Sequence, residues 1–207
     1  MMAGKKLPQH EIAGDILEKV LKAKKRLGLS KVRLLKWATE FSQVSLREVS
    51  PEKLKTIQFE VFAFFISMGA KGNGMKARTW SLDREGTIKP FPTPEQVRSI
   101  QQKLFETLEA CYKGQTTNIH LRDITFELDP GFRSRTMEMV PRVHDIEDGV
   151  HLLFVSLLSQ HGPVGKCPAC QKYFVLARGK KKFCKKQCQA NLASRRHRTK
   201  RKTSKNN

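Results

Sequence analysis

Five stretches of the chain carry apolar residues at helical spacing. They are residues 8–27, a shorter stretch after Ser30, the stretches that begin at Ser50-Pro51-Glu52 and at Thr93-Pro94-Glu95, and residues 145–160. Ser50 and Thr93 are suited to cap helix N-termini, because each is followed by a proline and an acidic residue. Gly28, Gly69 and Gly114 mark the expected ends of three of these helices.

The apolar positions also predict which residues form the core. Phe59 to Met68 is the most apolar part of the chain and is expected to be buried. Cys111 continues the helical spacing of Ile100, Leu104 and Leu108, so it is expected to be a core thiol rather than a redox or metal residue.

A hairpin is predicted where the apolar period changes from helical to alternating. Residues 117–128 alternate around Arg122-Asp123, Asp129-Pro130-Gly131 predicts a turn, and Thr136 to Val140 predicts the return strand. Residues 69–93 are rich in Gly and Pro without a Walker pattern, which predicts a flexible connector. The fold class is therefore α+β, with a mainly helical domain over residues 1–162 and a small β-hairpin, and His161 to Gly165 as a break before the next unit.

The C-terminal fifth contains four of the five cysteines, in two pairs with metal-ligand spacing. Cys167 and Cys170 can form a knuckle, and Cys184 and Cys188 share one face of a helix. Four thiolates and no open position indicate one structural Zn²⁺ ion. Two disulfides are disfavoured because the N-terminus lacks the apolar core of a secretory signal, and the compact paired spacing favours zinc over an iron–sulfur cluster. Reduced cysteines and a cytoplasmic location follow.

Positive charge is concentrated in the same segment. The formal net charge is +21, and residues 166–207 hold fifteen of the forty Lys and Arg residues but none of the nineteen Asp and Glu residues. Such an excess is typical of a surface that binds a polyanion. The candidate nucleic-acid contacts are Lys180, Lys181, Lys182, Lys185, Lys186, Gln189, Arg195, Arg196, His197, Arg198, Lys200, Arg201 and Lys202. A second basic group, at residues 22–36, is expected to be a solvated face, with auxiliary phosphate contacts as the alternative.

The residues between the cysteine pairs predict a treble-clef arrangement. Tyr173 to Leu176 form a strand, Arg178-Gly179 a turn, and Phe183 leads into the helix that carries the second pair. Tyr173, Phe174 and Phe183 are expected to pack around the zinc. The finger is assigned to residues 163–200 and is followed by a basic, disordered tail over residues 201–207.

This finger resembles that of the bacterial CGNR-type zinc-finger proteins. The resemblance rests on the first cysteine pair, Tyr173-Phe174, Phe183-Cys184, and a basic run after Cys188 that ends in Arg195-Arg196-His197-Arg198. Gln189, Ala190 and Asn191 replace the G, N and R of the family motif, so the role of those motif positions is not carried over. The layout of the N-terminal helices and hairpin is similar to the family's ABATE domain. The resemblance implies a DNA-binding transcriptional regulator.

The sequence favours a binding protein over an enzyme. A nuclease on a treble-clef frame needs a His base, but no His, Asp or Glu lies between Cys170 and Cys184. Asp145, Glu147 and Asp148 are explained as acids at a helix start. There is no Ser-His-Asp spacing, dinucleotide loop or zincin motif. The scattered histidines outside the finger are expected to be ordinary surface or packed residues: His120, His144, His151 and His161.

The predicted partner is double-stranded DNA, with structured RNA as the alternative. The protein is accordingly expected to associate with the nucleoid. Exposed aromatic side chains for base stacking would favour RNA. At 100° per residue, Cys188, Asn191 and Arg195 are expected to face the zinc and core, and Gln189 and Lys186 the groove. A non-specific phosphate grip remains the alternative for this helix. A homodimer and a small-molecule effector of the N-terminal domain remain open alternatives. No run of apolar residues approaches the eighteen needed for a membrane span, so a transmembrane helix is not expected.

Overall fold

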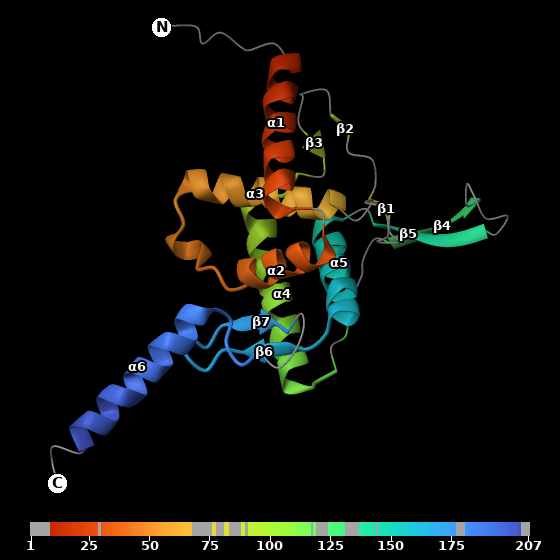
Figure 1. Ribbon diagram of the computed structural model, residues 1–207. Helices are drawn as coiled ribbons and strands as arrows, with labels where there is room; N and C mark the ends of the chain where they lie inside the picture. Colours follow the sequence, from red (N-terminus) through yellow and green to blue (C-terminus); the bar gives the residue numbers. More distant parts are fainter. Residues whose placement is uncertain are drawn as a thin grey trace, which may run out of the picture.

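The computed structural model in Figure 1 describes residues 9–28, 30–67, 76–77, 81–82, 88–89, 91–116, 118, 124–130, 137–143, 145–176 and 181–203. Only the backbone is described for residues 9–15, for the short strands between residues 76 and 89, and for residues 124–130, 137–142 and 196–203. Of the predicted features, Arg122-Asp123, Gly131, Thr136, His120, His144 and Arg178-Gly179 lie outside the described residues.

Helices dominate this part of the chain, and the predicted α+β fold class is confirmed. The α-helices are α1 (Gln9–Leu27), α2 (Lys31–Phe41), α3 (Pro51–Ile66), α4 (Pro94–Lys113), α5 (Ile146–His161) and α6 (Lys186–Thr203), with a 3₁₀ turn η1 at Leu46–Glu48. None of the helices within the described ranges combines the length and apolarity needed to cross a membrane.

The helix ends follow the predicted capping chemistry with one exception. Ser30, Ser50, Thr93 and Asp145 each accept hydrogen bonds from backbone N–H groups in the first turn. Gly28 and Gly114 end α1 and α4 in the left-handed region, at φ +71° and +68°. The predicted end of α3 at Gly69 lies outside the described residues, and the helix already ends at Ile66. There the Ser67 hydroxyl donates to the carbonyl of Ala63 at 2.7 Å and its N–H bonds back into the last turn.

α3 is the central helix of the body. It packs against α1, α4 and α5, so apolar residues are needed on every side. Phe62, Phe64 and Phe65 are fully buried, as the apolar run from Phe59 predicted. Trp37 of α2 packs its ring on Phe64, with ring centroids 5.1 Å apart.

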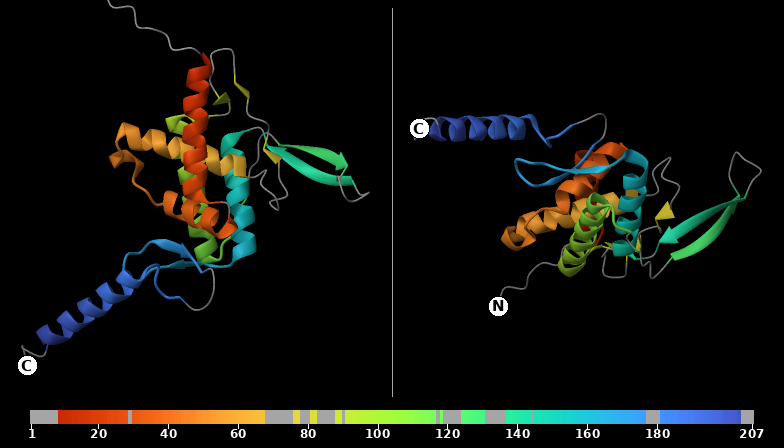
Figure 2. Two further views of the ribbon diagram at one scale, coloured as in Figure 1. Left: turned by 45° about the horizontal axis from the view of Figure 1, so that its top comes forward. Right: turned by 90° about the horizontal axis from the view of Figure 1, so that it is seen from below.

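The strands differ from the prediction in two places. β4 (Ile124–Pro130) and β5 (Met137–Val143) form the predicted antiparallel hairpin, which projects from the body in Figure 2. Asp129 and Pro130 are not in the turn, because they continue the ladder opposite Glu138 and Met137. The predicted connector contains short strands, because its backbone finds partners: β1 (Lys76–Ala77) extends β5 in parallel, and β2 (Ser81–Leu82) pairs with β3 (Ile88–Lys89).

The prediction that Cys111 is a core thiol is wrong. Cys111 is exposed, although Ile100, Leu104 and Leu108 on the same helix are fully buried. Its turn of α4 borders a cavity of about 320 Å³ that is also lined by α5 residues and by Val164. The apolar spacing continues along α4 to Cys111, but neighbouring helices no longer cover the helix at that turn. Partial burial still raises the pKa of the Cys111 thiol.

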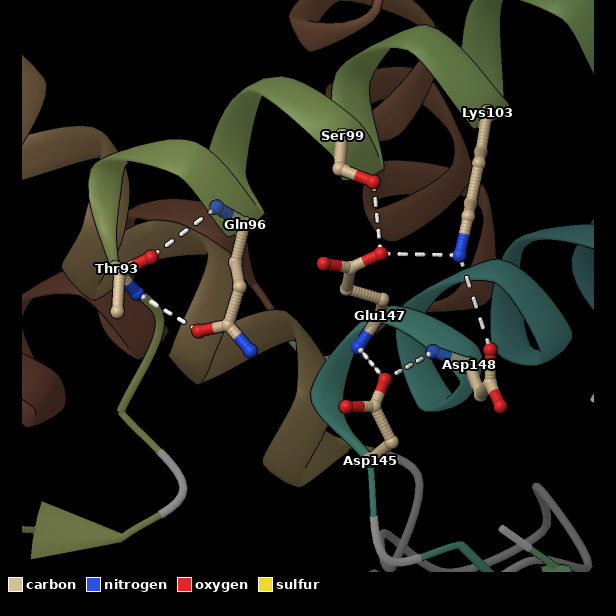
Figure 3. A network of polar contacts seen from close by, with 7 residues as sticks. All are labelled: Thr93, Gln96, Ser99, Lys103, Asp145, Glu147 and Asp148. Atoms are coloured by element: carbon tan, nitrogen blue, oxygen red, sulfur yellow. Dashed lines mark hydrogen bonds and ion pairs between the residues drawn. The ribbon is translucent and has the colours of Figure 1, made fainter. Parts of the chain in front are cut away.

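The acids at the start of α5 join this helix to α4 rather than forming a metal cluster (Figure 3). Asp145 caps α5 by accepting from the N–H groups of Glu147 and Asp148, at 2.7 and 3.0 Å. Glu147 Oε2 accepts from Ser99 at 2.7 Å and from Lys103 at 3.0 Å, and Lys103 Nζ lies 3.8 Å from the buried Asp148 carboxylate. The interpretation of these residues as helix-start acids is therefore confirmed for the cap and extended by an interhelical ion pair.

Candidate metal centre

A short hairpin carries the first pair of cysteines. β6 (Val164–Lys166) and β7 (Tyr173–Val175) pair antiparallel, with Lys166 opposite Tyr173, and the knuckle lies at the turn between them. The first cysteine pair therefore lies inside a hairpin that the sequence did not predict, and the turn expected at Arg178-Gly179 lies outside the described residues. Val164 to Lys166 form a strand that the Gly- and Pro-rich break concealed.

The knuckle is a tight turn that points several N–H groups at one sulfur. Cys167 N–H donates to Lys172 O at 2.9 Å, Gln171 N–H donates to Cys167 O at 2.8 Å, and Gln171 adopts φ +60°. Burial alone would raise the pKa of the Cys167 thiol, but the backbone N–H groups of Cys184, Cys170 and Ala169 lower it to about 6. These N–H groups favour the thiolate form of this ligand.

The second pair lies at the N-terminus of α6. Cys184 precedes the helix and Cys188 is in its first turn, where the Cys188 N–H donates to Lys185 O at 3.1 Å. Their sulfurs lie 3.4 Å apart. Burial and the neighbouring thiols raise the pKa of Cys184. A helix N-terminus favours negative charge, so it is a suitable position for thiolates.

The four thiols are positioned to hold one metal ion. All four sulfurs lie within 4.8 Å of one another, and Cys170 Sγ is 3.5 Å from Cys184 Sγ. A tetrahedral ion with bonds of about 2.3 Å requires sulfurs about 3.8 Å apart, close to these separations, whereas a disulfide requires about 2.05 Å. The predicted meeting of Cys167, Cys170, Cys184 and Cys188 is therefore confirmed.

The hairpin is docked on the helical body through Tyr173. This residue is only 6% exposed, and its ring lies 5.8 Å from that of Phe105 and 5.6 Å from that of Tyr112, both on α4. The sequence predicted that Tyr173 packs around the zinc. Its ring instead belongs to the core of the body, because β7 lies against α2 and β6 against α4.

A glutamine that the sequence did not single out completes this docking. The side-chain amide of Gln43, just after α2, pairs with the backbone of Tyr173 in both directions. The Tyr173 N–H donates to Gln43 Oε1 at 2.6 Å, and Gln43 Nε2 donates to Tyr173 O at 3.1 Å. Gln43 and Tyr173 are 130 residues apart, so no local pattern signals this pair.

The second half of the finger, α6, projects from the body in both Figure 1 and Figure 2. Between residues 186 and 195 only Cys188 and Leu192 are partly buried. The expectation that Asn191 and Arg195 face the zinc and core is wrong, since both are exposed and no other helix covers this side of α6 within the described part of the chain.

The candidate nucleic-acid contacts fall into three groups in the structure. Those with described, exposed side chains are Lys181, Lys182, Lys185, Lys186, Gln189 and Arg195. Those placed on α6 by their backbone alone are Arg196, His197, Arg198, Lys200, Arg201 and Lys202. Lys180 lies outside the described residues, and α6 continues to Thr203, into the segment assigned to the tail.

His151 is a packed histidine within the helical body. It is buried and lies 2.8 Å from the Thr107 hydroxyl across the α4–α5 interface. Burial and the nearby Lys103 lower its pKa, so the neutral ring is favoured. The burial of His151 and its contact with Thr107 agree with the expectation of a packed histidine.

Comparisons with known protein families, with curated proteins and with solved structures found no match for this chain.

The metal centre generates a stoichiometry prediction. We expect purified protein to contain about one divalent metal ion per chain, and Cys170→Ser to lose most of it, because three thiolates hold an ion less tightly than four. Elemental analysis checks this outcome. Cys111→Ser is the matched control, since its thiol lies outside the cluster. A metal-free protein, or equal loss in both variants, would contradict the assignment.

The docking contact generates a second prediction. Gln43→Ala leaves the Tyr173 N–H and C=O without their side-chain partners, at a cost of about 1–3 kcal/mol for each group left unsatisfied. We expect faster amide exchange at Tyr173 with little change at buried amides of α3. Hydrogen exchange followed by NMR measures both. Gln160→Ala is the control, because that exposed amide bonds Lys31 and Ser156 and, among the described residues, none of the hairpin. Unchanged exchange at Tyr173 would rule out the docking role.

Proposed function

We propose that the metal is a structural Zn²⁺ ion. Four thiolates form a soft ligand set, which suits zinc better than calcium or magnesium. All four ligand positions are filled by protein, so no position is left for a substrate or water, as in structural zinc sites. A finger of this size has little core of its own, and the ion would supply much of its stability.

We further propose that the finger binds double-stranded DNA. The observation that carries this proposal is a helix that begins at the four-cysteine cluster and stands away from the body with exposed cationic side chains. An exposed polar helix can enter the major groove of B-DNA, which is about 12 Å wide. Ala190 and Ala193 are exposed and small, so they permit close approach.

The burial of Tyr173 supports duplex DNA over single-stranded RNA. A single-strand reader needs aromatic rings on which bases can stack. Tyr173 is committed to the α4 rings, and Phe174 and Phe183 are only partly exposed. Cationic side chains therefore supply most of the accessible binding chemistry on the described finger.

The resemblance to the CGNR-type proteins supports the proposal that this activity serves transcriptional regulation in a bacterium. The paired cysteines and the basic run after Cys188 carry the resemblance, and Gln189, Ala190 and Asn191 depart from it. We propose a binding protein rather than an enzyme: the ligand set leaves no open metal position, and His151 is occupied by packing.

Salt dependence tests the proposal. With six to ten phosphate contacts, affinity for duplex DNA is expected to fall by about 10³–10⁵ between 50 and 200 mM salt. Replacing Lys185 and Lys186 together by Ala should lower the slope of log affinity against log salt by about two. Fluorescence anisotropy measures both. The control is Lys53→Ala with Lys113→Ala, two lysines of the helical body. A salt-insensitive affinity would favour a protein partner, and tighter binding of structured RNA would favour the RNA alternative.

Gln189 tests whether α6 reads sequence. Its amide can bond adenine in two directions, so Gln189→Ala should cost about 1–3 kcal/mol on the best site only. Selection from a random duplex library, before and after the substitution, measures the change in preference. Gln187→Ala is the matched control, because that amide is bonded to Asn191 at 2.9 Å. A uniform loss over all sequences would identify α6 as a non-specific phosphate grip.

A further inference from the structure

A groove separate from the finger runs between α1 and α3. It has a volume of about 700 Å³, within the range of small-molecule sites. It lies between the C-terminal half of α1 and the N-terminal half of α3. Its lining residues are Lys19, Lys22, Lys25, Arg26, Glu52, Lys55, Thr56 and Phe59.

The two helices make an apolar floor under a cationic rim. Val20, Ala23 and Leu27 of α1 are buried in the core, and this leaves the lysines on the neighbouring side of α1 to form one wall. Phe59 is 6% exposed and lies at the groove, and the Thr56 hydroxyl is already bonded to the carbonyl of Glu52 at 3.1 Å. The floor therefore offers mainly apolar surface.

The charges around this groove are unbalanced. Five cationic residues line it against the single carboxylate of Glu52. Arg26 is paired with Glu60 at 3.6 Å and Lys22 with Glu18, but Lys25 and Lys55 have no ion-pair partner among the described residues. A concave site lined by one sign of charge concentrates ions of the opposite sign.

We propose that this groove binds a small amphipathic anion. A carboxylate or phosphate head would pair with Lys25 and Lys55, one from each wall, and an apolar body would lie on Phe59. The shape favours such a ligand over the phosphate backbone of nucleic acid, because the groove has an aromatic floor. The position of the groove also favours a separate ligand, since α2 lies between α3 and the finger hairpin in Figure 1. The proposal does not depend on nucleic-acid binding by the finger.

The test uses the full metal-loaded chain and calorimetric titration with two amphipathic anions, dodecanoate below its micelle concentration and 1-naphthyl phosphate. Inorganic phosphate and dodecylammonium separate the contributions of head and body. We expect at least one amphipathic anion to bind once per chain, about ten-fold or more tighter than either comparison compound. A carboxylate preference indicates an acyl or aryl acid, and a phosphate preference a phosphorylated ligand.

Two variants locate the binding. Lys25→Ala with Lys55→Ala should weaken it by about ten-fold for each ammonium group removed from the anion's head. Thr56→Trp keeps every charge and should abolish binding by filling the groove, with circular dichroism to check folding. If that variant does not fold, Lys55→Glu replaces it, with the same expected loss. The control is Lys24→Ala with Lys53→Ala, which removes the same charge from the same helices outside the groove and should change affinity less than two-fold.

Several outcomes would overturn the proposal. They are binding of neither amphipathic anion, equal binding of inorganic phosphate, or binding unaffected by the groove variants. A duplex DNA titration runs in parallel. If the Lys25 and Lys55 substitutions weaken DNA binding and leave the amphipathic anions unaffected, the groove is a phosphate contact. If DNA and the anion bind together, with the anion alone sensitive to these substitutions, the groove is a separate ligand site.

Discussion

The finger depends on bringing four sulfur atoms from two segments within reach of one ion. Cys167 and Cys170 are held by a knuckle at the tip of a short two-stranded hairpin, and Cys184 and Cys188 by the start of α6. Neither segment has a core that would hold it against the other, so the ion is the shared constraint. The direction of α6 follows from it, since Cys188 is part of the first turn of that helix.

The docking of β7 transmits this constraint to the helical body. Tyr173 contributes its ring to the core and its backbone to the Gln43 amide, only three residues after Cys170. The base of the finger is thereby attached to α2 and α4, while α6 remains exposed. This combination suits a recognition helix: its root is held by packing and coordination, and its sides are left for a partner. The α1–α3 groove is lined by residues of α1 and α3, so a ligand there would contact different helices from those that hold the finger.

Positive charge has different environments in these two places. On α6 the cationic side chains stand on a projecting helix whose sequence contains no acid, which suits a long polyanion. At the α1–α3 groove the same residue types surround a buried phenylalanine and are partly neutralised by Glu18 and Glu60. Positive charge alone therefore does not define a partner. The shape of the surface and the apolar area next to the charges distinguish a site for nucleic acid from a site for a small anion.

Local chemistry by itself determined much of this protein. Helical spacing, the caps at Ser50 and Thr93 and the acids from Asp145 predicted the helices, because these signals lie within a few residues of the ends they specify. Each cysteine pair is local in the same way, and the joint site followed from the four ligands that zinc requires. Only the tertiary structure decided the exposure of Cys111, the strand Val164–Lys166, the burial of Tyr173 and its pairing with Gln43. Each of these depends on which surfaces meet across many residues, and periodicity along one segment contains no information about what covers it.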